Sequence, residues 1–359
     1  MQYFAVFVPG MEDVVAGIIN ERLSDVKIIK RLDGAVLFET DCTYDRLNFF
    51  CFNNIFAVID IQEQMSGRDF YGAEFPEFHM RKILNSAQNA GRNAISKNSI
   101  ISENNKKIKS FRMIFSVENK PVSINEKTRQ TIEELISHNS SLRTDRGRPD
   151  TEFWFLYRRE GFSVFMKRLT NNRIGEKTLH QGELSPQIAY LLCHIAALKH
   201  GETTADPFCG YGSIVIAASK YFHITKMYAC DIDAKCINIT KSKKGLDERC
   251  QIIQTDFRNM KKFLPEKIDS IVTDPPWGLY DSGIPVQKFY NEMTEVFSEM
   301  LKDEGRAVIL TAAITELEAA MENHKAFTLE KTIPVLVSGK KARVYLLKKQ
   351  MLHNNFNTQ

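Results

Sequence analysis

Residues 203–212 read Thr-Thr-Ala-Asp-Pro-Phe-Cys-Gly-Tyr-Gly. A short β-rich run ends at Asp206, two glycines follow, and Ser213 to Lys220 has the spacing of a helix. Glycines at a strand-to-helix turn let the backbone approach a ligand closely, and the helix N-terminus favours an anionic group. The stretch therefore predicts a ligand-binding turn. A dinucleotide fingerprint would place a third glycine at position 215, where this sequence has Val215.

Outward from this turn, β-rich and helical runs alternate along the second half of the chain. A helix is expected over Leu184–Lys199, before the turn. Alternation of this kind predicts an α/β fold with a parallel, doubly wound sheet. The last two strands have no long helix between them and predict an antiparallel hairpin at one edge. The expected strands are Thr203–Asp206, Lys226–Cys230, Gln251–Gln254, Ser270–Thr273, Arg306–Thr311, Thr328–Val335 and Arg343–Lys348.

Acidic residues follow the next two strands. Asp231 ends the second strand, where a carboxylate can accept hydrogen bonds from both hydroxyls of a ribose. Asp233 is equally placed to cap the helix that follows. After the third strand, Asp256 can accept a hydrogen bond from an adenine amine, and Phe257 can cover the ring. Each signal is weak alone, because aspartate is common at strand–helix junctions.

The fourth strand is followed by Asp274-Pro275-Pro276-Trp277, which is the most specific motif in the chain. Two prolines fix the backbone and supply no N–H donors to compete for its carbonyls. Asp274 and the Pro275 carbonyl can then accept from one amino group, and Trp277 offers a flat surface for a base to stack on. The alternative interpretation is a rigid turn with a buried tryptophan. Ligands bind at the carboxyl ends of strands in open α/β sheets, where all four motifs lie.

The first half of the chain has a different organisation. Residues 1–60 predict a small β-α-β-β-α-β unit of the ferredoxin-like type, with helices over 11–23 and 44–52. Residues 61–173 predict a second α+β unit, with helices over 76–94 and 126–139, a strand over 110–117 and a hairpin over 153–169. The polar residues 171–173 are the expected linker to a third domain over 174–359.

Charge is unevenly distributed along the chain. Residues 81–173 carry 19 lysines and arginines against 9 aspartates and glutamates. Such a block is a candidate footprint for nucleic acid, although a solvated charged surface explains it equally well. Arg143, Arg146 and Arg148 are the expected phosphate contacts, because they crowd a short segment beside Gly147 and Pro149.

Composition limits the other possibilities. The seven cysteines show no C-x-x-C spacing and the eight histidines no H-x-x-x-H pair, so we expect neither a disulfide framework nor a metal site. No apolar run approaches the ~20 residues of a membrane span, and residues 1–8 do not have the pattern of a signal peptide. The expected compartment is the cytoplasm.

The four motifs resemble those of the Rossmann-like class I methyltransferases that act on exocyclic amines. The resemblance implies S-adenosyl-L-methionine as cofactor and the [Asn/Asp]-Pro-Pro-aromatic tetrapeptide as the catalytic group, here with Trp277 where Tyr is commoner. Pyrimidine C5 enzymes need a cysteine at or near the tetrapeptide, and Cys209 lies in the cofactor loop instead. The matching cofactor-binding positions are Asp206, Pro207, Phe208, Gly210, Gly212, Asp231, Ile232, Asp256, Phe257 and Asp274.

The N-terminal half resembles the ferredoxin-like plus THUMP arrangement of tRNA and rRNA guanine-N2 methyltransferases. The resemblance rests on Val8-Pro9-Gly10-Met11-Glu12, on residues 110–170, and on Gly182-Glu183-Leu184-Ser185-Pro186 at the start of the catalytic domain. It implies methylation of a guanine N2 amine, with tRNA as the expected partner. The alternatives are an rRNA guanine-N2 enzyme, an adenine-N6 nucleic-acid methyltransferase, a non-catalytic RNA-binding protein and, least favoured, an NAD-dependent enzyme.

Overall fold

A computed structural model describes residues 1–44, 47, 49–63, 108–118, 120–140, 142–170, 179–278 and 285–351. The chain divides into two compact units. One contains residues 1–6, 18–49 and 53–172, and the other contains residues 7–17, 50–52 and 173–359. The predicted helix over 76–94 and the predicted linker over 171–173 lie outside the described residues.

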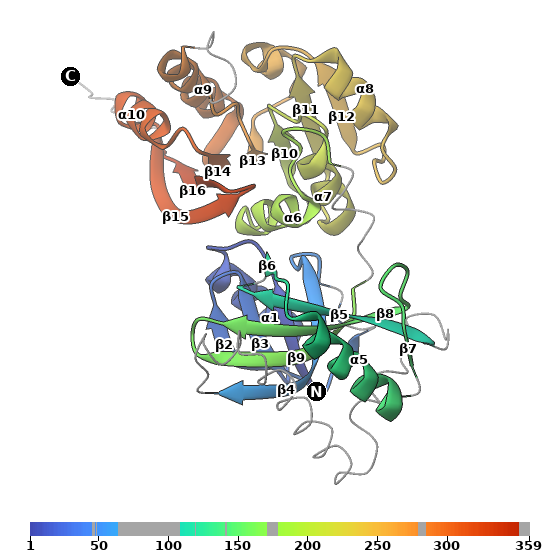
Figure 1. The fold of residues 1–359 in the computed structure, drawn as a ribbon. Coiled ribbons are helices and arrows are strands. Elements are labelled where there is room, and N and C mark those ends of the chain that lie inside the picture. Colours follow the sequence, from blue (N-terminus) through green and yellow to red (C-terminus); the bar gives the residue numbers. More distant parts are fainter. Residues whose placement is uncertain are drawn as a thin grey trace, which may run out of the picture. The chain divides into compact units, whose positions relative to one another are not determined.

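The first unit is built on one sheet with strand order β2-β3-β1-β4-β9-β8-β5-β6, and β7 pairs with β5 (Figure 1). β1 lies between β3 and β4, antiparallel to both, as in a ferredoxin-like unit. The predicted boundary at residue 60 falls within β4, which pairs with β9 and so joins the two halves of the sheet. The strands of this sheet are β1 (Gln2–Val6), β2 (Lys27–Leu32), β3 (Ala35–Glu39), β4 (Asn54–Glu63), β5 (Ser110–Val117), β6 (Lys120–Pro121), β7 (Arg143–Thr144), β8 (Thr151–Arg158) and β9 (Phe162–Arg168).

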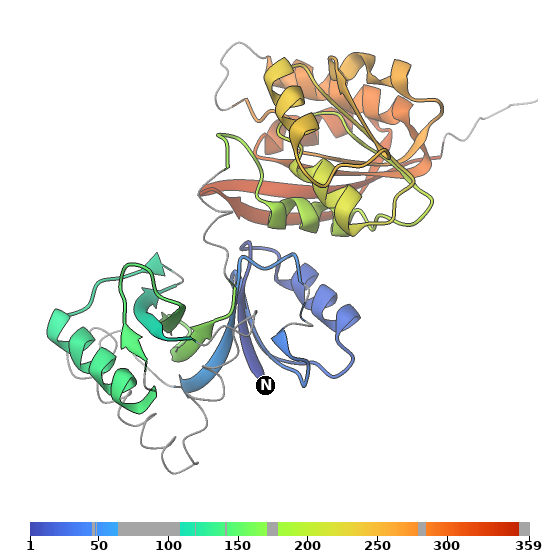
Figure 2. The ribbon, with the colours of Figure 1, turned by 90° about the vertical axis from the view of Figure 1, so that its right-hand side faces the viewer.

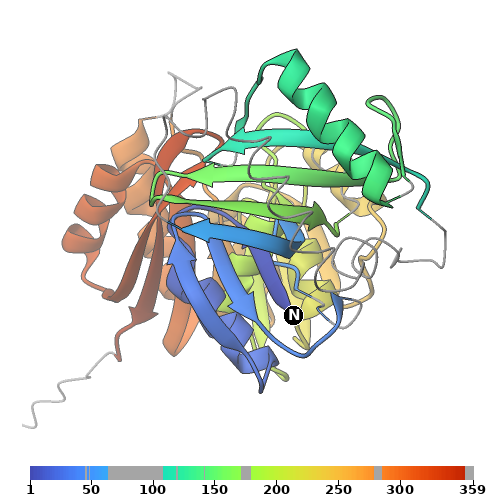
Figure 3. The ribbon, with the colours of Figure 1, turned by 60° about the horizontal axis from the view of Figure 1, so that its bottom comes forward.

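Several predicted elements of this half are confirmed. β5 has the predicted bounds, and β8 and β9 form the predicted antiparallel hairpin. Helix α1 (Glu12–Arg22) follows β1. Helix α5 (Glu126–Ser140) runs along the sheet (Figure 3) and buries Ile132 and Ile136 against aromatic residues of β5 and β8.

The expected helix over 44–52 is wrong. No α-helix is found among the described residues of that segment, where the Leu47 N–H donates to the Tyr44 carbonyl and the Phe49 N–H donates to the Leu47 carbonyl. The apolar residues that gave a helical pattern, such as Cys51 and Phe52, are nonetheless buried. The spacing of apolar residues therefore indicated burial but not secondary structure. In short segments this spacing does not distinguish a helix from other buried structure.

The second unit contains a seven-stranded sheet of order β12-β11-β10-β13-β14-β16-β15. The first five strands in this order are parallel, and β16 and β15 form the predicted antiparallel hairpin at one edge. Each strand contains the predicted core residues and differs from the expected range only at its ends. The strands are β10 (Thr203–Asp206), β11 (Lys226–Asp231), β12 (Cys250–Gln254), β13 (Ile268–Thr273), β14 (Leu301–Thr311), β15 (Phe327–Val337) and β16 (Lys340–Lys349).

Helices lie on both faces of this sheet (Figure 2). The apolar residues of η2, α9 and α10 pack on the core of one face, in a cluster that includes Phe257, Phe297 and Leu317. Helix α6 is capped by Ser185, whose hydroxyl accepts from the Ile188 N–H. The helices are α6 (Pro186–Ile195), α7 (Ser213–Tyr221), α8 (Ala234–Ser242), the 3₁₀ helix η2 (Phe257–Phe263), α9 (Val286–Met300) and α10 (Ile314–His324). Among the described residues, no helix has the length and apolar character needed to cross a membrane.

Candidate active site

The structure brings the four sequence motifs to one edge of the second sheet. β12, β11, β10 and β13 are neighbours in that order, and a motif follows the carboxyl end of each strand. Hydrogen bonds join neighbouring motifs, among them one from the Thr255 N–H to the Asp231 carbonyl at 3.1 Å. The Gly210 N–H donates to Asp231 Oδ2 at 2.8 Å, and the Thr273 hydroxyl donates to Asp206 Oδ1 at 2.7 Å.

Asp206 is buried at the end of β10 and is only 1% exposed. Its Oδ1 accepts from Thr273 and from the Phe208 N–H at 3.2 Å, whereas its Oδ2 has no hydrogen-bond partner among the described residues. Burial raises the pKa of this carboxyl to about 7, against the lowering effect of both hydrogen bonds. A buried polar atom without a partner is rare in folded proteins and calls for an explanation.

Two glycines shape the turn after Asp206. Gly210 and Gly212 have φ of 47° and 79°, in the left-handed region that favours glycine. A Cβ at Gly212 would lie 2.4 Å from Thr240 Cγ2, whereas a Cβ at Gly210 would meet no atom of the described part of the chain within 4 Å. The Thr240 hydroxyl donates to the Gly210 carbonyl at 2.9 Å. Helix α8 therefore holds the turn from one side and leaves open space beside Gly210.

Asp231 is fixed by two backbone donors. Besides the Gly210 N–H, its carboxylate accepts from the Asp233 N–H at 2.9 Å. Asp233 itself caps α8 by accepting from the Lys235 N–H at 2.8 Å, so the capping role falls to this residue. Ile232, between the two acids, is 72% exposed. An exposed apolar side chain beside an oriented carboxylate suits a ligand with a flat apolar ring and a polyhydroxyl part.

Asp256 and Phe257 are positioned differently from the expectation. The Asp256 carboxylate caps η2 by accepting from the Arg258 N–H at 2.9 Å, and its Oδ2 accepts from the Arg258 guanidinium at 2.8 Å. Phe257 is only 4% exposed and packs against Phe208 with ring centroids 4.9 Å apart. Phe257 therefore contributes mainly to the core, half-buried Phe208 packs against that core, and both Asp256 oxygens contact Arg258.

The tetrapeptide after β13 forms one hydrogen-bonded unit. The Trp277 indole Nε1–H donates to Asp274 Oδ1 at 2.8 Å. Burial raises the pKa of the Asp274 carboxyl to about 8, the Trp277 bond opposes that shift, and the negative charge of Asp206 adds to it. Pro275 is buried and Pro276 is exposed. The carboxylate that could accept from an amine and the ring that could stack on its base are thus held together.

The three arginines expected to bind RNA are all exposed, but they are not equivalent. The Arg146 guanidinium donates to Glu133 Oε2 at 2.6 Å and to Glu126 Oε1 at 2.8 Å, both on α5. These two carboxylates raise the pKa of Arg146. Its charge is therefore largely compensated within the protein, and Arg143 and Arg148 are the stronger candidates for phosphate contacts.

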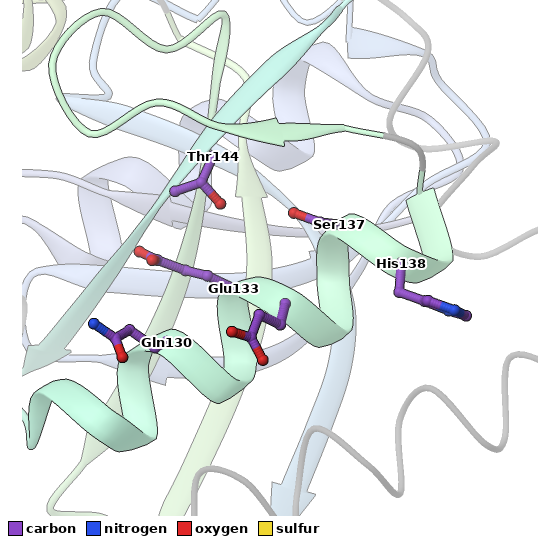
Figure 4. Close-up of a pocket in the computed structure, with 6 residues that line it drawn as sticks. Gln130, Glu133, Ser137, His138 and Thr144 are labelled. Atoms are coloured by element: carbon purple, nitrogen blue, oxygen red, sulfur yellow. The ribbon is translucent and has the colours of Figure 1, made fainter.

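A pocket of about 510 Å³ lies beside Arg146's partner Glu133, between α5 and β7 (Figure 4). In the close-up, Gln130 and Glu133 extend from α5 toward the segment that carries Thr144. The pocket is lined by Gln130, Glu133, Glu134, Ser137, His138 and Thr144 and contains none of the predicted site residues.

Sequence reasoning missed an aromatic pair beside the glycine turn. The rings of His180 and Tyr211 stack with centroids 4.3 Å apart at an interplanar angle of 16°. Glu183 supports this arrangement by accepting from the His180 N–H at 3.0 Å. Tyr211 lay inside a recognised motif, but nothing in the sequence pairs it with a histidine 31 positions earlier. Cys209, in the same turn, is buried, and burial raises the pKa of its thiol, which suits packing and not nucleophilic attack.

Comparison with known proteins adds to this geometry. Residues 175–343 match the family model of the RMKL-like methyltransferase domain. A tRNA (guanine(10)-N2)-dimethyltransferase of Methanothermobacter thermautotrophicus is 27% identical over 208 residues, covering 54% of this chain and 60% of that protein. A tRNA (guanine(6)-N2)-methyltransferase of Thermus thermophilus is 29% identical over 178 residues, covering 48% of this chain and 52% of that protein. The chain thus spans about half the length of the curated relatives it matches.

Solved structures resemble the chain over almost its full length. The crystal structure of TrmN from Thermus thermophilus has a TM-score of 0.75 at 21% identity and covers 97% of this chain and 99% of its own. A putative methyltransferase complexed with SAH has a TM-score of 0.69 at 16% identity, covering 98% of both chains. At these identities the likeness establishes the fold, which is the predicted Rossmann-like methyltransferase sheet preceded by an α+β region.

Proposed function

We propose that this chain is an S-adenosylmethionine-dependent RNA methyltransferase that modifies the N2 amine of a guanosine, with tRNA as its substrate. One observation supports this most strongly: the Asp274–Trp277 unit follows the carboxyl end of β13, next to the strand that leads into the glycine turn, and Asp231 ends the strand beyond it. The relatives named as tRNA guanine-N2 methyltransferases, which match about half of the chain, support the amine and the RNA class.

The described residues fit the cofactor. The open space at Gly210 and the partnerless Asp206 Oδ2 suit a ligand with a cationic end. Asp231 would hold the ribose hydroxyls, and the exposed Ile232 would cover the adenine. Asp256 would accept from the adenine amine only if it shared its oxygens with Arg258. When bound, S-adenosylmethionine supplies an electrophilic methyl group on a sulfonium.

The tetrapeptide would act on the target base. A guanine amine is a poor nucleophile because its lone pair is delocalised into the ring. Asp274 and the Pro275 carbonyl, accepting from this amine, would localise the lone pair, while Trp277 stacks on the base after it has swung out of its helix. Transfer leaves one proton in excess on the nitrogen, and Asp274, whose pKa burial raises to about 8, would accept that proton when its carboxyl is ionised. Positioning and electrostatics would account for most of the rate enhancement and would together lower the activation barrier by several kcal/mol.

The first unit would hold the RNA. Arg143 and Arg148 are exposed and, unlike Arg146, have no hydrogen-bonded carboxylate partner among the contacts of the described residues. We also propose that the chain has three parts, divided at residues 60 and 173, and that the second part is THUMP-like. We propose a cytoplasmic location for the protein.

The test is methyl transfer to a defined RNA. The protein is incubated with S-adenosylmethionine and unmodified tRNA, and the digested nucleosides are identified by mass spectrometry. We expect N2-methylguanosine. N6-methyladenosine would assign the site to adenine, the same product from rRNA fragments alone would change the substrate, and no product with any RNA would reject the proposed activity.

A further inference from the structure

The tetrapeptide turn depends on an anchor outside itself. Pro275 and Pro276 have no backbone N–H, so these two residues cannot hold the turn by donating hydrogen bonds. The Tyr290 hydroxyl on α9 lies 3.2 Å from the Pro276 carbonyl oxygen and 2.6 Å from the Thr311 hydroxyl at the end of β14. Tyr290 and Thr311 are both 0% exposed. Three elements thus converge on one buried hydroxyl beneath the turn.

The directions of these hydrogen bonds follow from counting donors. The Ala313 N–H donates to Thr311 Oγ1 at 2.9 Å, so Thr311 already accepts one bond and has one proton to give. A carbonyl oxygen only accepts, so the Pro276 carbonyl needs the proton of Tyr290. Both buried hydroxyls are satisfied in one arrangement, in which Thr311 donates to Tyr290 and Tyr290 donates to Pro276.

We propose that Tyr290 is a positioning residue for the catalytic tetrapeptide, acting through the Pro276 carbonyl; this rests on the proposed function. Holding the Pro276 carbonyl inward fixes the rotation of the preceding peptide, whose Pro275 carbonyl must face the amine. It also fixes Trp277, the next residue, whose indole donates to Asp274. Tyr290 therefore sets the relative placement of the two amine acceptors and the stacking ring without touching the substrate.

The Tyr290 hydroxyl is buried and has a hydrogen-bond partner on each side. Burial raises the pKa of Tyr290, with the Thr311 bond opposing that shift, so the phenol keeps its proton and stays a donor. A phenylalanine would fill the same space and leave the Pro276 carbonyl without its donor. The apolar contacts of the ring, which packs against Phe289, would be retained.

The test compares Tyr290→Phe with Tyr345→Phe. Tyr345 is also 0% exposed and belongs to the same core cluster, but it lies on β16 and its hydroxyl donates to Glu318 Oε1 at 2.9 Å instead of to the tetrapeptide. We expect Tyr290→Phe to lower kcat for tRNA methylation about 10- to 100-fold, as loss of correct positioning does, with the KM for S-adenosylmethionine within about 2-fold. Tyr345→Phe should leave kcat within about 2-fold.

A second readout does not need activity. Trp154 and Trp277 are the two tryptophans of the chain, so a Trp154→Phe background makes Trp277 the sole indole. Tyr290→Phe should raise the acrylamide quenching of Trp277 at least about 2-fold because the turn loosens, and Tyr345→Phe should not. If Tyr290→Phe does not fold, Thr311→Val, which removes the donor to Tyr290, should show the same changes more weakly. Thr311→Ser, which keeps that donor, should have the kcat and the quenching of the parent protein.

Unchanged kcat and unchanged quenching in Tyr290→Phe, or equal losses in both tyrosine variants, would overturn the positioning role. If the parent methylates no RNA but quenching still rises only in Tyr290→Phe, the anchor stands and the proposed function falls. If the parent is active and neither readout responds, the function stands and the anchor falls.

Discussion

Asp231 gives the sharpest quantitative prediction about the cofactor. Its carboxylate accepts from the Gly210 and Asp233 N–H groups, at 2.8 and 2.9 Å. An ionised carboxylate has about four acceptor sites, so two remain for ribose hydroxyls. Asp231→Ala removes the ribose contacts and also frees the Gly210 N–H that fixes the glycine turn. Hydrogen bonds to a charged group contribute about 1.5–3 kcal/mol. We therefore expect the affinity for S-adenosylmethionine to fall about 10- to 150-fold.

The assay is isothermal titration calorimetry of the folded variants. Asp231→Asn keeps one acceptor oxygen and should lie between the parent and Asp231→Ala. Asp233→Ala is the matched control, because Asp233 caps α8 and makes no predicted ligand contact. It should lower the free energy of unfolding by about 1 kcal/mol, the usual contribution of a cap, with affinity nearly unchanged. Unchanged affinity in Asp231→Ala, or an equal loss in Asp233→Ala, would refute the ribose assignment.

Two further predictions concern charge. Burial raises the pKa of Asp274 to about 8, above the ~3.9 of an unfolded aspartate, so the folded protein binds more protons and its stability falls as pH rises between these values. Asp274→Asn lacks this titration. The melting temperature of the variant minus that of the parent should therefore increase between about pH 5 and pH 8.5. A difference that stays constant over this range would show that the pKa of Asp274 is not raised. For RNA, Arg143→Ala with Arg148→Ala should reduce the slope of log affinity against log salt by about 2, near one per lost phosphate contact. Arg146→Ala, which breaks the bonds to Glu126 and Glu133, should lower the melting temperature and leave the salt slope nearly unchanged. An unchanged melting temperature with a reduced slope would show that Arg146 contacts phosphate.

The sequence predicted the second unit well because its signals are local and repeated. Strand–helix alternation located all seven strands of the second sheet, and the lack of a long helix before β16 predicted the edge hairpin. In the first half, the apolar pattern over 44–52 failed because buried turns and helices share that pattern. The pairing of β4 with β9, which merges the two predicted N-terminal units into one sheet, joins residues about 100 positions apart, and no local signal reports it.

The site shows the same division. Asp206, Asp231 and Asp274 could be predicted as site residues because each stands at the carboxyl end of a strand, where ligands bind in open sheets. The partners of these residues were not found, because they come from other elements. Thr273, Tyr290 and Arg258 look in sequence like an ordinary strand end, a core aromatic and a surface charge. Only the fold shows that they contact Asp206, Pro276 and Asp256.

The central claim, that Asp274 acts on the target amine while other residues hold the cofactor, is tested most directly by Asp274→Ala. Methyl transfer from tritiated S-adenosylmethionine to tRNA is measured in single turnover, together with cofactor affinity by calorimetry. We expect loss of transfer with the dissociation constant of the cofactor changed by no more than a few-fold, since the contact is with the base. Near-normal transfer by a folded Asp274→Ala variant would contradict it.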